Sequence, residues 1–325
     1  MTYLENSKQY TGTELENIFF RPMLTGESAQ ELGVRVLYNM PQPTHIQLWD
    51  GQRNILQKFT SAGWTGGVPA AKKEKTVNLS RVKAELGFSA ADYFSMVYEK
   101  ITALANVNMD DLSGTDLEQA ETALFRQALA ENIRATMWIG NTAGASGYNT
   151  FDGFLKSITT QVSDEAIYNF TYQESSLADP AYAVELFDKL WNKSDLRIQD
   201  LKADGQLAFF VTSDLCHLYE KYLDSKGADA AYTDTVNGRR TLAYHGIPVI
   251  DLRLGGYLAE TSYHQSFGML TDRRNLVLAV NTADMPGNEV RMWYNPDEME
   301  NRQRAVFMAG SQILDASLIT YAYKQ

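Results

Sequence analysis

The chain has 325 residues, of which 44% are hydrophobic and 21% charged, an ordinary globular composition that argues against wholesale disorder. Its formal net charge of −11 argues against a protein that grips nucleic acid by its phosphates, because such a protein needs a basic surface. With Cys216 as the only cysteine, neither an internal disulfide framework nor a cysteine-based zinc site can form.

The start of the chain, MTYLENSKQY, lacks the basic and apolar regions of a secretory signal. No apolar run approaches the roughly 18 residues needed to span a membrane. We therefore expect a soluble protein made in a cytoplasm. Residues 1–38 are polar with scattered aromatic side chains, such as Phe19 and Phe20, and have no sustained period. They can bury these aromatic residues only against another surface, so 1–38 is predicted to be an extended arm.

Residues 39–88 have the pattern of a long β-excursion. THIQLWDGQ alternates apolar and polar residues ahead of an Asp-Gly turn, and KKEKTVNLSRV predicts a half-buried strand with Val77 and Leu79 on its buried side. GWTGGVP, between them, is typical of a loop tip. The excursion has too few apolar residues to be a domain, and Trp49 and Trp64 would be exposed in a monomer, so another surface must support it.

Residues 89–139 are predicted to be helical. Ser89–Leu104 forms one helix. A second helix begins at a capping box made by Thr115 and Glu118 and runs for about 25 residues, or about 37 Å. Its broad apolar stripe at helical spacing indicates a helix packed on a core. The stripe consists of Leu117, Ala120, Leu124, Phe125, Ala128, Leu129, Ile133 and Met137.

A glycine-rich loop, GNTAGASGYNTFDG, follows this helix, with glycines at positions 140, 144, 147 and 153. A phosphate-binding loop needs a strand before the glycines and Lys-Ser or Lys-Thr at the start of the next helix. Here a long helix comes first and no such pair ends the loop, and the dinucleotide-binding pattern does not fit either. We interpret the loop as a flexible connection between two rigid bodies.

The rest of the chain alternates helices and strands. AYAVELFDKLWNKS and LCHLYEKYL predict helices, and QLAFFVTSD and the run Ile247–Ile250 predict strands. Asn237-Gly238 is a strong hairpin signal. NLVLAVN and EVRMWYN predict two further strands separated by Pro286-Gly287, and RAVFMAGSQILDASLITYAY closes the chain with strand-like runs.

No group of residues has the pattern of a catalytic, cofactor-binding or metal site. Cys216 and His217, near Asp214, suggest a nucleophile, but neighbours on a helix point about 100° apart, and an acid at a helix start is explained by capping. A lone cysteine on an apolar helix face is usually a small core residue. The histidines lack the spacing that favours a metal site; they are His45, His217, His245 and His264. A basic run indicates a charged β-tip protected from aggregation; it comprises Lys72, Lys73 and Lys75.

The order of arm, β-excursion, long helix, glycine loop, α/β lobe and closing strands resembles the major capsid protein of tailed phages (Caudoviricetes), which has the α+β Hong-Kong-97-type fold. LFRQALAENIRATMWIGNTAGASGYNTFDGFLKSI is similar to the spine helix of that family as it enters the A-domain. YHGIPVIDL resembles its late A-domain strand, and RMWYNPDEMENRQRAVFMAGSQILDASLITYAY resembles its closing strands.

The resemblance implies a division of the chain into an N-terminal arm, an E-loop hairpin, a P-domain and an A-domain. The expected boundaries are 1–38 for the arm, 39–88 for the E-loop, 89–140 for the P-domain with its spine helix at 115–139, 141–275 for the A-domain, 276–313 for the returning P-domain strands and 314–325 for the last A-domain strand. Some members of the family crosslink an E-loop lysine to a neighbouring subunit. Candidates in the corresponding region are Lys58, Lys72, Lys73 and Lys75, and none of them aligns clearly with that role.

The resemblance also implies a structural protein without enzyme activity, cofactor or metal. Its copies would assemble as hexamers and pentamers into an icosahedral virion shell around double-stranded DNA, after synthesis in a bacterial cytoplasm. Expected partners are further copies of the chain, a separate scaffolding protein, a portal protein and decoration proteins, with DNA held by enclosure and no membrane contact. If the glycine loop is a hinge, replacing Gly144 and Gly147 with valine should impair assembly more than folding. An encapsulin-like compartment and an α/β enzyme with an unrecognised site remain alternatives.

Overall fold

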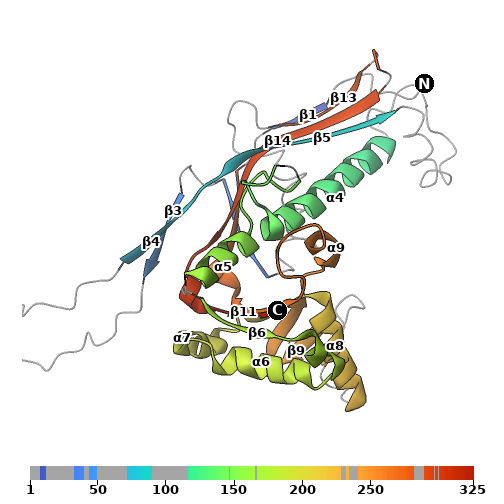
Figure 1. Cartoon of the computed structure of the whole chain (residues 1–325). Helices are drawn as coiled ribbons and strands as arrows, with labels where there is room; N and C mark the ends of the chain where they lie inside the picture. The colour runs from blue at the N-terminus through green and yellow to red at the C-terminus, as the bar shows by residue number, and fades with distance from the viewer. Residues whose placement is uncertain are drawn as a thin grey trace, which may run out of the picture.

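The computed structural model describes residues 8–11, 33–39, 44–49, 72–89, 116–145, 147–164, 167–227, 232–233, 241–281, 289–295, 297–298 and 300–325. Several interpretations above concern residues outside these ranges: Phe19 and Phe20, the Asp-Gly turn, Lys58, the GWTGGVP tip, the first helix beyond Ser89, Thr115 of the capping box, and Asn237-Gly238. Figure 1 shows an elongated sheet with helix α4 lying along it, a second body of sheet and helices below it, and a two-stranded ribbon that leaves the side of the molecule.

The elongated first sheet has six strands arranged around β14 (Glu300–Ile313). β14 pairs with β5 through residues 300–309 and with β13 through residues 300–306, so these two strands lie on opposite sides of it. Burial alternates along β14 with a period of two, so one face of the sheet lies on a core. The other strands are β1 (Lys8–Tyr10), β2 (Arg35–Tyr38), β5 (Ser80–Ser89), β12 (Leu276–Asn281) and β13 (Glu289–Asn295).

Helix α4 (Asp116–Ile139) covers the core face of this sheet (Figure 1). Phe125, Leu129, Ile133 and Met137 are buried at four-residue spacing, in one core cluster with side chains of β12, β13 and β14. The helix predicted at 115–139 is therefore confirmed to within a residue. Its buried stripe is narrower than predicted, because Leu124 and Ala128 are only half-buried.

The ribbon consists of β3 (Thr44–Trp49) and β4 (Lys72–Val77), paired antiparallel. The predicted strand KKEKTVNLSRV is interrupted at Asn78 and Leu79, where the chain steps from the ribbon into β5. This step is tight, since a Cβ on Gly310 would lie 2.2 Å from the carbonyl oxygen of Asn78. Val77 and Leu79 are buried, as predicted. The helix predicted from Ser89 is wrong at its first residue, because the pairing with β14 continues β5 through Ser89.

The second sheet has seven strands in the order β6–β15–β11–β7–β10–β9–β8. Its central strand β7 is buried on both faces: Ala208 and Phe210 face the core shared with α4, whereas Phe209 and Val211 face a second core under helices α6 and α8. The elements are β6 (Tyr168–Tyr172), α6 (Tyr182–Asn192), α7 (Leu196–Asp200), β7 (Leu207–Val211), α8 (Ser213–Ser225), β8 (Tyr232–Thr233), β9 (Thr241–Tyr244), β10 (Ile247–Asp251), α9 (Gly255–Leu258), β11 (Phe267–Asp272) and β15 (Ile319–Lys324).

The helices and strands predicted between 181 and 325 are confirmed as α6, β7, α8, β10, β12, β13, β14 and β15. The sequence also contains a hairpin that was not predicted. β9 and β10 pair around His245 and Gly246, whose φ angles of 48° and 79° are those of a type I′ turn. The fold is α+β, as predicted. No helix among the described residues is long and apolar enough to cross a membrane.

Candidate functional site

The chain passes between the two sheets at three places, and this junction is the candidate functional site because it joins the two bodies. α4 leads through 140–153 to α5 (Phe154–Ser163) and then to β6. β11 leads into β12 through the short helix η6 (Arg273–Asn275). β14 leads into β15 through residues 314–318, which include η7 (Ala316–Leu318).

The first crossing is the glycine-rich loop, and hydrogen bonds tie it down. Oδ1 of Asp152 accepts from the backbone N–H of Thr142 at 2.8 Å, from its Oγ1 at 2.7 Å and from Nζ of Lys156 at 2.7 Å. Burial raises the pKa of Asp152, but these hydrogen bonds outweigh it and hold the pKa below its usual value. The carbonyl of Asp152 accepts from Oγ of Ser311 on β14 at 2.6 Å. The loop is thus bonded both to itself and to the first sheet.

Two of the glycines are required by close packing. The N–H of Gly153 donates to the carbonyl of Gly140 at 2.8 Å. A Cβ on Gly140 would lie 2.3 Å from the carbonyl oxygen of Phe151, and a Cβ on Gly153 would lie 2.6 Å from that of Trp138. Gly147 differs, because the space around it is open and its φ is +66°. The interpretation of the loop as a flexible connection is therefore corrected: the chain needs glycine here for close approach and for one left-handed turn.

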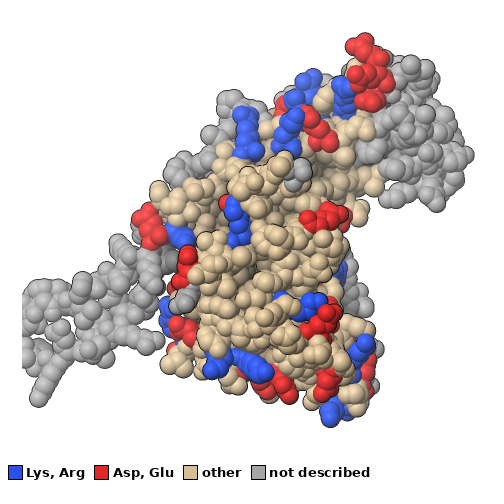
Figure 2. All heavy atoms as spheres, viewed as in Figure 1, with Lys and Arg blue, Asp and Glu red and all other residues tan. Residues whose placement is uncertain are grey.

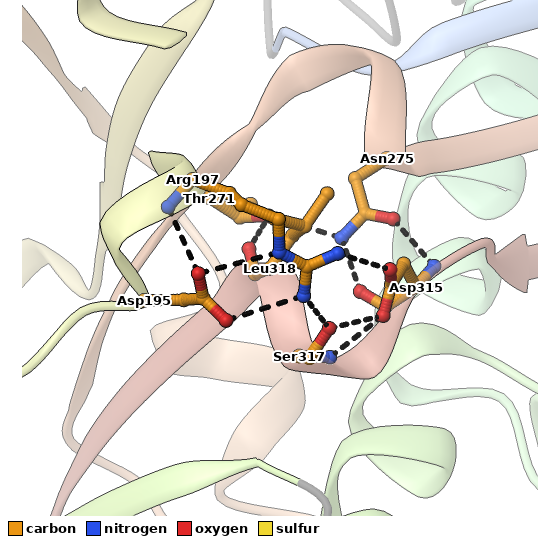
Figure 3. Close-up of polar contacts among 7 residues, drawn as sticks. All are labelled: Asp195, Arg197, Thr271, Asn275, Asp315, Ser317 and Leu318. Carbon is orange, nitrogen blue, oxygen red and sulfur yellow. Dashed lines mark hydrogen bonds and ion pairs between the residues drawn. The ribbon is translucent and has the colours of Figure 1, made fainter. Parts of the chain in front are cut away.

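At the second and third crossings, Asn275 binds the backbone of Asp315 as a neighbouring strand would (Figure 3). Oδ1 of Asn275 accepts from the N–H of Asp315 at 2.8 Å, and its Nδ2 donates to the carbonyl of Asp315 at 2.9 Å. Oγ1 of Thr271 donates to the carbonyl of Leu318 at 2.7 Å. Asn275 is almost fully buried. These bonds clamp β11–β12 and β14–β15 together at the point where both leave one sheet for the other.

Arg197, from helix α7, joins the same cluster (Figure 3). Its Nη2 donates to Oδ2 of Asp195 at 3.2 Å and to Oγ of Ser317 at 2.5 Å, and its Nη1 lies 3.4 Å from Oδ2 of Asp315. Oδ1 of Asp315 in turn caps η7 by accepting from the N–H of Ser317. The guanidinium therefore links the outer layer of the second body to the crossing itself.

The residues considered as a nucleophile do not form a catalytic group. The Cys216 thiol is buried, and burial followed by the nearby carboxylates of Asp251 and Glu220 raises its pKa to about 12, so little of it is thiolate at neutral pH. His217 points to Glu220, with 3.6 Å between Nδ1 and Oε2. Asp214 lies in the first turn of α8 and accepts a hydrogen bond from Ser266.

The remaining candidates are dispersed. His45 contacts Glu74 across the ribbon at 2.7 Å, His245 lies in the β9–β10 turn, and His264 stacks on Tyr323 with 4.0 Å between ring centroids. In the part of the chain that the structure describes, no group of three or more His, Cys, Asp or Glu side chains could hold a metal ion. Lys75 belongs to β4 in the ribbon, as do Lys72 and Lys73.

Sequence reasoning missed Asn275, Arg197 and Asp315. A local signal exists, because Asp195-x-Arg197 and Asp315-x-Ser317 share the spacing of an aspartate that accepts from the backbone two residues later. That signal predicts a turn at each position. Nothing in the spacing indicates that positions 118 residues apart, Arg197 and Asp315, meet.

No protein-family model matches the chain, and no curated protein matches it. Solved structures do match. A chain of the satellite phage P4 procapsid, which includes size determination (Sid) protein, superposes with a TM-score of 0.57 and 11% identity, covering 93% of this chain and 96% of that one. Chains from Gordonia phage Cozz (TM-score 0.51, 12% identity, 92% and 87% covered) and Mycobacterium phage Ogopogo (0.50, 12%, 92% and 92%) are also similar. The chain thus shares the fold of these solved structures, the Hong-Kong-97-type fold that the resemblance implied.

Proposed function

We propose that this protein is the structural subunit of an icosahedral phage shell, assembled as hexamers and pentamers around double-stranded DNA. The observation that carries the proposal is the ribbon, which projects from the body in Figure 1. Within the described part of the chain, β3 and β4 pair only with each other. An isolated two-stranded ribbon is at best marginally stable in water, so it needs the surface of another molecule. A neighbouring copy is the natural support in a shell.

The proposal assigns a role to each body. The first sheet with α4 is the P-domain, the ribbon is the base of the E-loop, and the second sheet with α6 and α8 is the A-domain around the capsomer centre. The boundaries are those expected from the sequence, with 141–275 and 314–325 in the A-domain. β1 and β2 of the arm add to the first sheet through β13 and β12. The fold and the match along nearly the whole chain support this assignment.

The charge distribution supports enclosure of DNA without tight binding. Figure 2 shows Lys and Arg side chains along the elongated body and mixed acidic and basic side chains over the lower body, without a large basic field on this face. The formal net charge is −11. Such a subunit repels a polyanion on average, which suits a container. The expected further partners are a scaffolding protein, a portal protein and decoration proteins, in a virion assembled within a bacterial cytoplasm.

The first experiment measures the mass of the purified recombinant protein by light scattering, alone and with a candidate scaffolding protein, and images the same fraction by negative stain. Closed particles, or rings of five and six subunits, are expected. Nuclease-resistant DNA in particles from infected cells separates a virion shell from a compartment that holds a cargo enzyme. A subunit that stays monomeric or dimeric under all of these conditions would refute the proposal.

A variant without the ribbon tests its role directly. Thr44 and Val77 lie opposite each other in the ladder, so residues 45–76 can be replaced by a short Gly-Ser turn. We expect this variant to keep the circular dichroism spectrum of the folded subunit and to form no particles. Particles in normal yield would show that assembly does not depend on the ribbon.

A further inference from the structure

One edge of the first sheet is open along the described residues, and that edge is β5. Among these residues, β14 is the only strand that pairs with β5, through all ten of its positions. Figure 1 shows β5 as a long strand along the border of the sheet beside α4. A long edge strand is a template for pairing with another chain unless a device blocks it. The order of side chains on β5 indicates which chain it fits.

The two faces of β5 differ in chemistry. Arg81, Lys83 and Glu85 are exposed on the outer face, whereas Val82 is buried and Ala84 half-buried on the face toward α4. Lys83 and Glu85 contact each other within the chain at 2.9 Å. In an antiparallel pair, residues directly opposite each other lie on the same face of the sheet. A strand that adds to β5 must therefore match this alternation.

A second copy of β5, placed antiparallel across a two-fold axis at Ala84, matches it. In this register Lys83 lies opposite Glu85 of the other copy, and Val82 lies opposite Leu86. Moving the axis by one residue in either direction sets Lys83 against Lys83 or Glu85 against Glu85. An axis placed between two residues would set the apolar residues of one copy on the charged face of the other. An axis at Lys83 also pairs Arg81 with Glu85, but it sets the two Lys83 side chains against each other. Of these three axes, only the one at Ala84 pairs unlike charges on the outer face without placing like charges opposite each other.

We propose that the first sheets of two copies join edge to edge through β5 of each, around a two-fold axis at Ala84. The proposal rests on the proposed shell function and names one of its subunit contacts. A single strand pair buries little surface, so the contact is weak alone and gains its strength from the other contacts of a closed shell.

A groove beside β5 fits the same partner. It has a volume of about 500 Å³ and lies between β5 and α4. Its apolar lining includes Ala84, Leu86, Phe125, Leu129 and Phe151. Added strands place alternate side chains on this face, so the second copy would cover the groove with Val82 and Leu86. Phe125, Leu129 and Phe151 are already buried in the subunit, so the half-buried Ala84 and Leu86 are the part of the lining that the second copy would remove from water.

Cysteine crosslinking tests the register. The native Cys216 is buried, so its contribution to crosslinking is small. The axis brings the two Ala84 Cβ atoms to about 5 Å, within reach of a disulfide, and leaves the two Gly87 positions about 20 Å apart. Particles of Ala84→Cys, oxidised and run on a non-reducing gel, should give mostly covalent dimers, and the matched control Gly87→Cys should give monomers. Monomeric Ala84→Cys in normal particles would overturn the register.

Charge reversal at Lys83 tests the same register independently, and it remains available if Ala84→Cys fails to assemble. Lys83→Glu sets like charges opposite each other twice and should lower particle yield about ten-fold at low salt, with less effect at high salt. Lys83→Glu/Glu85→Lys restores unlike pairs and should recover the yield to within about two-fold. A normal yield from the single variant, or no recovery in the double variant, would overturn the proposal. Wild-type protein is assembled in the same experiment as a control. If it forms particles, the shell function holds even when the variants overturn the β5 contact.

Discussion

Replacing Gly153 with serine separates two reasons for a glycine at the junction. Gly153 is the N-cap of α5, with φ −87° and ψ 170°, a conformation open to any residue. Serine is among the preferred N-cap residues, so helix capping alone predicts a small gain in stability. Close packing predicts the opposite, because a Cβ here lies 2.6 Å from both the Trp138 carbonyl oxygen and the N of Gly140.

The magnitude follows from the two contacts. Ordinary contacts of a Cβ begin near 3.4 Å, so the backbone of Trp138 or Gly140 must move by roughly 0.8 Å in a filled core. Overpacking of this kind costs about 1–3 kcal/mol, and the gain from capping is only a few tenths. We expect Gly153→Ser to lose about 3 kcal/mol, because both contacts are with backbone. Gly147→Ala, which meets no atom but has φ +66°, should lose about 1 kcal/mol from the left-handed backbone alone.

The assay is thermal unfolding of the unassembled subunit, followed by tryptophan fluorescence. At about 2–4 °C per kcal/mol, Gly153→Ser should melt about 6–12 °C below the wild type and Gly147→Ala about 2–4 °C below it. The two glycines share one loop, so a general effect of loop stiffening would move both variants equally. A Gly153→Ser subunit that is as stable as the wild type would refute the close-packing argument.

Three further predictions concern other parts of the molecule. Asn275→Ala should cost about 2–4 kcal/mol in urea unfolding, because it leaves the N–H and carbonyl of Asp315 without their partner. Asn275→Asp keeps the acceptor but sets a buried carboxylate oxygen against the Asp315 carbonyl, so it should cost at least as much at neutral pH. Burial raises the pKa of Tyr172 and Tyr321, so the neutral phenols favour the folded state. Stability is full below pH ~10 and should fall as pH rises above it, and the fall should be smaller in the Tyr172→Phe variant, in which only Tyr321 of the two still titrates. The Cys216 thiol, with its pKa raised to about 12, should react with maleimide at pH 7.5 only as fast as the subunit unfolds, and labelling within minutes under native conditions would contradict its burial.

The hydrophobic pattern predicted those elements whose buried residues follow a regular spacing within a short stretch of sequence. α4 was predicted almost to the residue because Phe125, Leu129, Ile133 and Met137 carry the helical period themselves, and β7 was predicted because its five residues are all apolar. The break at Asn78 was missed for the opposite reason. The alternation of Val77 and Leu79 continues through it, and the cause of the break, β14 crossing at Gly310, is more than 200 residues away in the chain.

The contacts at the junction could not be predicted from local sequence patterns for the same reason. A glycine needed for freedom and a glycine needed for close approach look alike in a sequence. Only the carbonyl of Trp138 beside Gly153, and the bonds of Asp152 across the loop, distinguish them. Likewise, Asn275 reads as an ordinary turn residue until its partner Asp315 is known.

A junction fixed at three crossings has a consequence for the proposed shell. Hexamers and pentamers require copies of one chain in slightly different settings, and some part of each copy must absorb the difference. The crossings are poorly suited to it, since bending there would break the bonds of Asn275 and the packing of Gly153. The base of the ribbon is held by a small cluster in which Val77, Leu79 and Ala279 are the buried members. Few apolar side chains mean a low free-energy cost of local movement. The adjustment is therefore expected between ribbon and sheet and at the contacts between copies, while the two bodies keep one relative orientation.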